Sequence, residues 1–194
     1  MATNDQITTQ IFRDIPFTSD ETAFINSKFE RRIIKKGEVV LRANDIVTHQ
    51  YYVSEGCLRT FFIDPLGKEH TLQFAIKDWW ISDYTAFFEQ NNAILTIDCI
   101  QNAILYEVSK TGIDEIYNAI PKVETYFRKK MEKAFASFQN RILSNLAKPA
   151  KERYIDFIST YPNIESRIKN YHIASYLGIT TESLSRIRKE LIRT

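Results

Sequence analysis

The 194-residue sequence contains few of the residues that break or cross-link a chain, with only five Gly, five Pro and two Cys. So little Gly and Pro argues against long disordered segments. The two cysteines, Cys57 and Cys99, form no CxxC or other metal-ligand spacing. We therefore expect two buried thiols in a reducing cytoplasm. Two cysteines are also too few to ligate a [4Fe-4S] cluster within one chain.

Targeting signals and long apolar runs are missing as well. The N-terminus, MATNDQITTQIFRD, has neither a basic n-region nor an apolar h-region, which predicts that the protein is not secreted. No run approaches the roughly 20 apolar residues that a membrane-spanning helix needs. The sequence therefore predicts a cytoplasmic protein without a membrane partner.

Enzyme motifs and clustered metal ligands are also lacking. The chain has no GxSxG, Walker or HExxH motif. A metal-dependent cupin needs clustered histidines, whereas His49, His70 and His172 lie far apart without an HxH pair. Lone histidines are more often structural, which argues against His49, His70 or Cys57 as a haem ligand. We expect no enzyme activity, no metal and no cofactor.

Apolar residues, by contrast, are plentiful. They make up 44% of the chain, with 13 Phe and 10 Tyr, which is enough for a buried core. Near the N-terminus, FTSDETAFINSKF predicts a short helix, because Thr18 and Glu21 have capping-box spacing. Phe24, Ile25 and Phe29 would form the apolar face of this helix.

The region from Arg32 to about Val108 consists of short β-prone runs broken by turn signals. Within it, FFIDPLGKEHTLQF predicts a hairpin with its turn at residues 64–67, because Asp, Pro and Gly favour tight turns. Many short strands at this spacing predict an antiparallel roll or sandwich rather than a parallel sheet.

A long helix is predicted after Pro121, a suitable first helical residue, because Lys122 to Leu146 contains no Gly or Pro. At 1.5 Å per residue this helix is about 37 Å long and would overhang a roll of this size. Its apolar residues recur every three or four positions and form one stripe: Val123, Phe127, Met131, Ala134, Phe138, Ile142 and Leu146. We expect the stripe to pack on the same helix of a second subunit, the alternative being its own roll.

Positive charge is concentrated in the last quarter of the chain. Residues 148–194 carry nine Lys and Arg against five Asp and Glu, a balance of +4. Residues 1–147 carry 17 basic and 19 acidic side chains, a balance of −2. This asymmetry favours a polyanionic partner for the C-terminal part.

The C-terminal segment NYHIASYLGITTESLSRIRKEL (170–191) has the spacing of a helix-turn-helix. Ala174 is small where two helices would cross, and Gly178 suits the positive φ of a sharp turn. Thr180 can cap the second helix. The apolar positions that would hold the helices together are Ile173, Leu177, Ile179, Leu184 and Ile187.

The outward face of the second helix would carry Thr181, Glu182, Ser185, Arg186 and Lys189. The N-terminal part of such a helix enters the DNA major groove, where Arg can donate twice to guanine and Glu can accept from cytosine. Ser183, Arg188 and Lys189 are better placed for phosphates. The alternative is a helical hairpin in which only the apolar positions matter.

A β-roll, a long helix and a C-terminal helix-turn-helix in this order resemble the Crp/Fnr superfamily, named after the cyclic-AMP receptor protein. The residues that carry the resemblance are IIKKGEVVLRANDIVTHQYYVSEGCLRTFFIDPLGKEHTLQFA (33–75) and IASYLGITTESLSRIRKEL (173–191). It implies an α+β fold with a jelly-roll-like cyclic-nucleotide-binding-like roll at 1–113. A dimerisation helix at 114–147 and a winged-helix-like helix-turn-helix domain at 148–194 would follow.

The resemblance implies a homodimeric transcription regulator that binds a palindromic operator in double-stranded DNA, with RNA polymerase as a further candidate partner. On the matching positions, Thr181, Glu182 and Arg186 would contact bases, while Thr180 and Ser183 would lie against the DNA backbone. We expect a reduced wing, because residues 163–170 have room for a strand pair at most. The alternative is a small-molecule-binding or interaction module that does not read DNA.

Relatives that bind cyclic AMP hold it between a Gly-Glu-Leu turn and an Arg-Ser pair. Here the corresponding candidate pocket contains Trp80, Ser82, Asp83, Tyr84, Ala93 and Ile94. No Lys or Arg occurs from residue 78 to residue 109, and a buried phosphodiester without a cation is costly. We expect weak or no cyclic-AMP binding and an unknown effector. The aromatic residues there either line a cavity for an uncharged ligand or, as we favour, fill it: Trp79, Trp80, Tyr84, Phe87 and Phe88.

Overall fold

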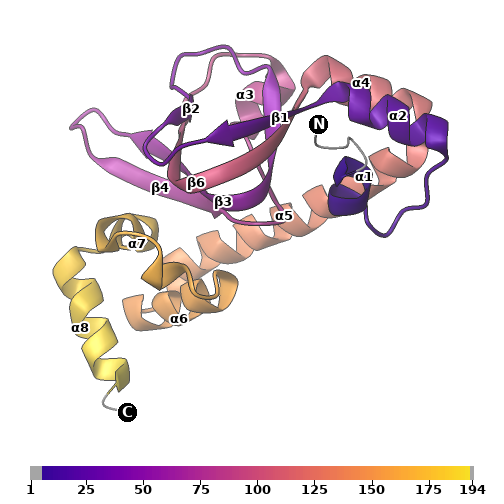
Figure 1. Ribbon diagram of the computed structural model, residues 1–194. Helices are drawn as coiled ribbons and strands as arrows, with labels where there is room; N and C mark the ends of the chain where they lie inside the picture. Colours follow the sequence, from indigo (N-terminus) through magenta and orange to yellow (C-terminus); the bar gives the residue numbers. More distant parts are fainter. Residues whose placement is uncertain (1–5, 193–194) are drawn as a thin grey trace. The chain divides into compact units, whose positions relative to one another are not determined.

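The computed structural model describes residues 6–192 (Figure 1). The outer ends of the predicted regions 1–113 and 148–194 therefore lie outside the described residues. Contacts divide the chain into two compact units, one of residues 1–60 and 74–131 and the other of residues 61–73 and 132–194. The three-part division expected from the sequence stays a prediction.

The predicted antiparallel roll is confirmed by a six-stranded sheet. Its strands are β1 (Phe29–Ile34), β2 (Val39–Leu41), β3 (His49–Ile63), β4 (Glu69–Ala75), β5 (Trp79–Ile81) and β6 (Thr96–Ser109). The strand order is β1-β6-β3-β4, with β2 paired to β6 and β5 paired to β3. Strands β1 and β2 both pair antiparallel with β6, and β5 pairs antiparallel with β3. In the register of β1 and β6, Ile33 lies opposite Ile104. Strand β4 is the last in this order, so one of its edges has no neighbouring strand among residues 6–192.

The first unit also contains the short helices α1 (Gln6–Ile11), α2 (Ser19–Lys28), α3 (Tyr84–Glu89) and α4 (Lys110–Ala119), of which α1, α2 and α4 lie together at one end of the sheet (Figure 1). The predicted capping box of α2 is confirmed, since the Glu21 N–H donates to Thr18 Oγ1 over 3.2 Å and the Thr18 N–H donates to the Glu21 carboxylate over 2.8 Å. Phe29 was expected on this helix but is the first residue of β1. None of the described helices combines the length and apolarity needed to cross a membrane.

The predicted long helix is α5 (Pro121–Ala147), and its apolar stripe divides into two parts. In the first part, Val123 and Phe127 are buried in the core of the first unit, where the Phe127 ring centre lies 4.7 Å from that of Trp80. Packing on its own roll is therefore the correct interpretation for this part. In the second part, Met131 and Ala134 are half-buried, whereas Phe138, Ile142 and Leu146 are exposed. Phe135 and Leu143, which lie outside the stripe, are exposed as well.

The predicted hairpin joins β3 to β4, and its segment 61–73 belongs to the second unit. The turn at residues 64–67 is confirmed, because the Gly67 N–H donates to the Asp64 carbonyl over 2.9 Å. The Asp64 carboxylate also accepts the N–H groups of Leu66 and Lys68 over 2.9 and 3.0 Å. These bonds fix the short turn from within.

The remainder of the second unit is helical. It contains α6 (Ala150–Thr160), a 3₁₀ turn at Ile164–Ser166, α7 (Asn170–Leu177) and α8 (Thr181–Ile192). Residues 163–170, for which we expected a strand pair at most, contain no strand; the 3₁₀ turn lies in this segment, and its Ile164 side chain is buried. Residues 132–192 contain no strand.

Candidate functional site

The last two helices pack together through the apolar positions that the sequence singles out. Leu184 and Ile187 of α8 are 0% and 6% exposed. Their counterparts on α7 are also buried: Ile173, Ala174 and Leu177. Burying these side chains between two short helices leaves the other side of α8 in solvent.

The turn between α7 and α8 has the predicted geometry. Gly178 has a φ of +66°, and no atom lies within 4 Å of where a Cβ would stand, so glycine is needed here for backbone conformation rather than for space. Thr180 caps α8, because its hydroxyl accepts the Ser183 N–H over 3.2 Å. The Thr180 hydroxyl also donates to Ser183 Oγ over 3.3 Å. The two residues predicted to lie against the DNA backbone are therefore hydrogen-bonded to each other.

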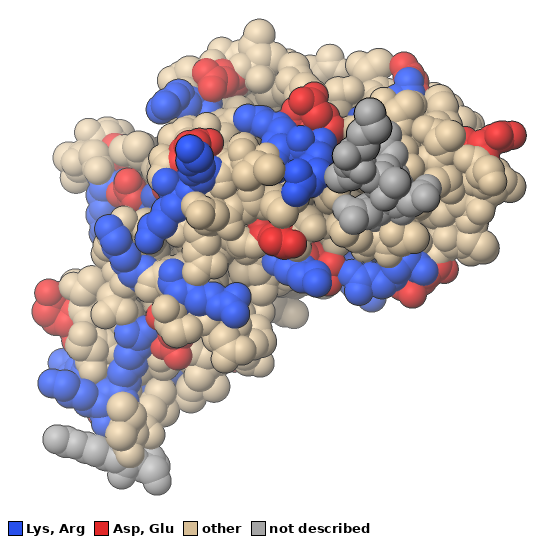
Figure 2. All heavy atoms as spheres, viewed as in Figure 1, with Lys and Arg blue, Asp and Glu red and all other residues tan. Residues whose placement is uncertain are grey.

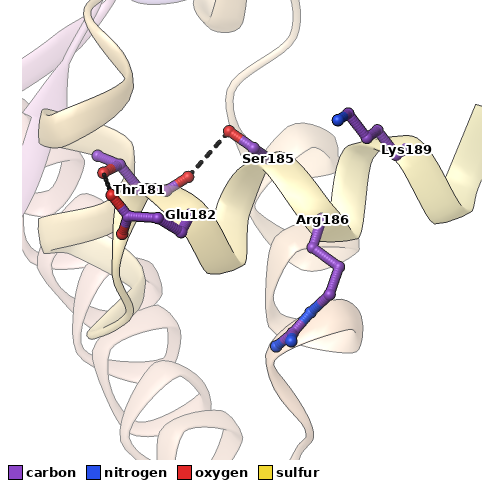
Figure 3. A pocket seen from close by; sticks show the side chains of 5 residues that line it. All are labelled: Thr181, Glu182, Ser185, Arg186 and Lys189. Carbon is purple, nitrogen blue, oxygen red and sulfur yellow. Dashed lines mark hydrogen bonds between the residues drawn. The ribbon is translucent and has the colours of Figure 1, made fainter.

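The five residues predicted to face outward from α8 line one shallow depression: Thr181, Glu182, Ser185, Arg186 and Lys189 (Figure 3). Thr181 Oγ1 donates to the Glu182 carboxylate over 3.1 Å, and Ser185 Oγ donates to the Thr181 carbonyl over 3.0 Å. Hydrogen bonds from the Glu182 backbone N–H and from nearby hydroxyls lower the pKa of the Glu182 carboxyl, which keeps it ionised as an acceptor.

Arg186 and Lys189 are the cations of this face. Both side chains are exposed and point away from the helix in Figure 3. Among residues 6–192 neither of them forms an ion pair. Figure 2 shows further basic side chains over the α8 end of the second unit, with few acidic ones beside them. The face can therefore donate hydrogen bonds and attract an anion.

Arg188 does not lie where the sequence suggested. We expected it to contact phosphates, but its guanidinium points into the second unit. Its Nη2 lies 2.7 Å from the Glu165 carboxylate, its Nη1 donates to Asn170 Oδ1 over 2.7 Å, and its Nε donates to Tyr154 Oη over 3.1 Å. Arg188 thus ties α8 to the segment before α7, and this structural role replaces the predicted phosphate contact.

The candidate effector pocket in the first unit is occupied by the chain itself. Asp83 is 1% exposed, and its carboxylate accepts the Ala86 N–H at the start of α3 over 3.3 Å. It also accepts the N–H groups of Ile94 and Leu95 over 2.9 and 3.0 Å. These donors lie at the helix start and at the Ala93-Ile94 position, where relatives would bind a cyclic phosphate. The Asp83 carboxylate therefore occupies the hydrogen-bond donors of this position.

The other candidate pocket residues mostly belong to the core. Trp80 and Ala93 are buried, and Ser82 Oγ donates to the His49 carbonyl over 2.9 Å. Burial raises the pKa of Tyr84, whose hydroxyl is buried without a hydrogen-bond partner among the described residues. Ile94, by contrast, is 62% exposed and points out of the core. Of the remaining aromatic residues, Phe87 is buried, Trp79 half-buried and Phe88 exposed. This burial supports the favoured interpretation of a filled pocket.

Neither the cysteines nor the histidines form a metal site in the part of the chain that the structure describes. Cys57 and Cys99 are both 1% exposed and form no disulfide, as predicted for buried thiols. His70 Nε2 lies 2.9 Å from the Asp64 carboxylate, and His49 Nδ1 lies 2.8 Å from Thr48 Oγ1. Both histidines therefore have local structural partners.

Two residues that the sequence did not single out, Ser175 and Arg141, connect α7 to other segments of the second unit. Ser175 contacts Glu69, which is 106 positions away. No local pattern reveals a contact over such a separation, and only the folded arrangement could have identified it.

Residues 31–119 match the family of cyclic nucleotide-binding domains. The chain is 25% identical over 190 residues to electron transport regulator A of Shewanella oneidensis, covering 89% of this chain and 74% of that protein. It is 22% identical over 190 residues to the fumarate and nitrate reduction regulatory protein of Vibrio cholerae, with the same coverage. The structure of FixK2 from Bradyrhizobium japonicum superposes with a TM-score of 0.74 at 16% identity, covering 85% of each chain.

The fold and the matched region define a protein that carries a cyclic nucleotide-binding-type domain followed by a helical C-terminal region. Within that class, the proteins that the chain is similar to are transcription regulators of the Crp/Fnr type, the superfamily that its sequence resembles. These relatives are regulators rather than enzymes.

Proposed function

We propose that this protein is a cytoplasmic, homodimeric transcription regulator that binds a palindromic operator sequence-specifically through α8. The observation that carries this proposal is the outer face of α8, where five polar side chains line one depression while Leu184 and Ile187 anchor the opposite side. A helix held in this way can enter the major groove without unfolding.

The side chains on this face divide by the chemistry that each can offer. Arg186 can donate two hydrogen bonds to a guanine, and the Glu182 carboxylate can accept from a cytosine amino group. Thr181 lies beside Glu182 and would contact the same base pairs. Thr180, Ser183, Ser185 and Lys189 would lie against the sugar-phosphate backbone and fix the register of the helix on DNA.

The exposed second part of the α5 stripe supports the homodimer. Phe138, Ile142 and Leu146 are 42%, 58% and 80% exposed, and they lie on one side of the helix. Burying each of them would contribute roughly 2 kcal/mol. Packing α5 against its copy in a second subunit covers this stripe and generates the two-fold symmetry of a palindromic site.

The roll is not expected to use cyclic AMP as an effector. Asp83 already accepts the backbone N–H groups that a cyclic phosphate would need. A second negative charge in that place would meet the Asp83 carboxylate without a compensating cation, because residues 78–109 contain no Lys or Arg. The effector, if the protein uses one, is of a different chemical class. RNA polymerase is a further candidate partner at promoters that the protein activates.

Selection of genomic DNA fragments by the purified protein, without added ligand and at two salt concentrations, tests the proposal. We expect an enriched palindrome that Arg186→Ala fails to retain, with affinity lower by about 100-fold because both half-sites of the dimer lose a bidentate contact. Arg31→Ala, which removes the same charge from an exposed position of the first unit, is the matched control and should select as the wild type does. Enrichment that is the same for the wild type and Arg186→Ala would contradict the proposal. Added cyclic AMP should change neither result.

A further inference from the structure

The hydroxyl of Ser175 on α7 binds the open edge of strand β4. Ser175 Oγ donates to the Glu69 carbonyl over 2.8 Å and accepts the Thr71 N–H over 2.9 Å. In a β-strand these two backbone groups point to the same edge, and a neighbouring strand would normally satisfy them. A single side chain of α7 thus takes the place of a neighbouring strand.

Arg141 on α5 binds the same strand and the same helix. Its guanidinium donates to the Leu72 carbonyl, to the Thr71 carbonyl over 3.1 Å and to the Tyr176 carbonyl over 3.4 Å. It also lies 3.9 Å from the centre of the Tyr176 ring, within the range of a cation–π contact. Arg141 therefore joins three segments of the second unit: α5, the β3–β4 hairpin and the end of α7.

A third side chain strengthens the connection between α5 and α7. Arg153 on α6 donates to the Leu177 carbonyl at the end of α7 over 3.1 Å. It also donates to the carbonyls of Asn145 and Lys148 at the end of α5, over 3.3 and 3.4 Å. The last carbonyls of a helix carry partial negative charge and lack partners within the helix, so a guanidinium placed there stabilises both ends together.

These contacts determine where α8 points. The turn between α7 and α8 is only three residues long, 178–180, and α8 packs on α7 through buried side chains. An α7 fixed to α5 therefore fixes the direction of α8 relative to the α5 axis. In the proposed dimer, α5 packs against its copy beside the two-fold symmetry axis. The distance between the two α8 helices therefore depends on the same contacts.

We propose that Ser175 and Arg141 are positioning residues that set the half-site spacing of the operator. This inference rests on the proposed function, because it needs a dimer that reads a palindrome. Neither residue faces DNA; both act by holding α7 against β4 and α5. Weakening either contact should leave base recognition by α8 intact while letting the two α8 helices vary in separation.

The test measures affinity for duplexes in which the spacer of the selected palindrome is shortened or lengthened by one or two base pairs. We expect the wild type to bind one spacing at least about tenfold better than its neighbours, because a shifted half-site is also rotated around the duplex. Ser175→Ala and Arg141→Lys should bind that spacing less tightly and discriminate less between spacings. Their sequence preference on a single half-site should stay unchanged. Arg141→Lys keeps the charge, so a loss of non-specific attraction cannot explain its effect.

Ser137→Ala, on the exposed surface of α5, is the control and should keep the wild-type spacing profile. Hydrogen exchange at the Thr71 amide reports the contact without DNA and should be slow in the wild type and faster in Ser175→Ala. If Ser175→Ala and Arg141→Lys both keep the wild-type spacing profile, or if the Thr71 amide of the wild type is unprotected, the inference is overturned while the proposed function stands. A wild type that selects no palindrome overturns both.

Discussion

At the residue scale, the carboxylate of Asp83 stands where related proteins would bind a charged ligand. Three backbone N–H groups converge on it, and it is almost completely buried. These bonds form within the chain itself, without a ligand. The loop at residues 93–95 is therefore held to the start of α3 by a side chain.

Replacing Asp83 by Ala should destabilise the first unit by about 3 kcal/mol, because the helix cap is lost and buried N–H groups remain without an acceptor. Asp83→Asn keeps one acceptor oxygen and should cost less. Urea denaturation of each variant measures the effect. Asp20→Ala, an exposed aspartate at the start of α2, should change the stability little. Equal midpoints for Asp83→Ala and the wild type would show that Asp83 does not hold the loop.

At the element scale, α5 changes its role along its length. Its first turns complete the core of the roll through Val123 and Phe127, and its later turns expose an apolar stripe to solvent. An isolated helix face of this kind is unfavourable in water, which favours a partner that covers it. In the proposed dimer, the two parts of one helix connect folding of the roll to assembly.

Ile142→Glu should convert the dimer to monomers, with a dimer dissociation constant raised by at least about 100-fold, because each subunit places an unpaired charge in the apolar contact. Sedimentation velocity over a range of concentrations measures the change. Asn140→Glu introduces the same charge two residues away, on the other side of the helix, and should remain dimeric. Dimers that persist in Ile142→Glu would place the interface elsewhere.

At the scale of the whole molecule, the charge asymmetry should appear as a strong salt dependence of DNA binding. Lys189→Ala should weaken binding to all sequences similarly and reduce the slope of log K against log salt by about two, since the dimer loses two phosphate contacts. Titrations at several salt concentrations provide the slope. Lys35→Ala, which removes an exposed cation from the first unit, serves as the comparison and should keep the wild-type slope. An unchanged slope for Lys189→Ala would place this side chain away from the phosphates.

The features that could be predicted from sequence are those whose causes are local. The capping box of Thr18 and Glu21, the turn at residues 64–67 and the glycine turn before α8 all depend on groups within a few positions of one another. The apolar periodicities of α5 and α8 are local in the same sense. For this reason the sequence alone predicts the order of roll, long helix and helix-turn-helix.

The features that escaped prediction depend on groups brought together by folding. Arg188 has a position on α8 that suits a phosphate, but Glu165 and Asn170 lie close enough to turn it inward. The sequence around Ser175 gives no indication of its hydrogen bonds to β4. Asp83 was predicted only as a pocket residue, yet it caps α3, and two of its three bonds go to residues 11 and 12 positions further on.

The packing of Trp80 gives the protein a built-in optical probe. Both tryptophans of the chain, Trp79 and Trp80, stand on β5 in the first unit, and the Trp80 ring lies 5.5 Å from that of Tyr52 and 4.7 Å from that of Phe127. Tryptophan fluorescence therefore reports the melting of the roll alone, whereas far-ultraviolet circular dichroism also follows the helices of the second unit. Comparing the two signals in one titration shows whether the roll and the helical second unit unfold as one cooperative body or in succession.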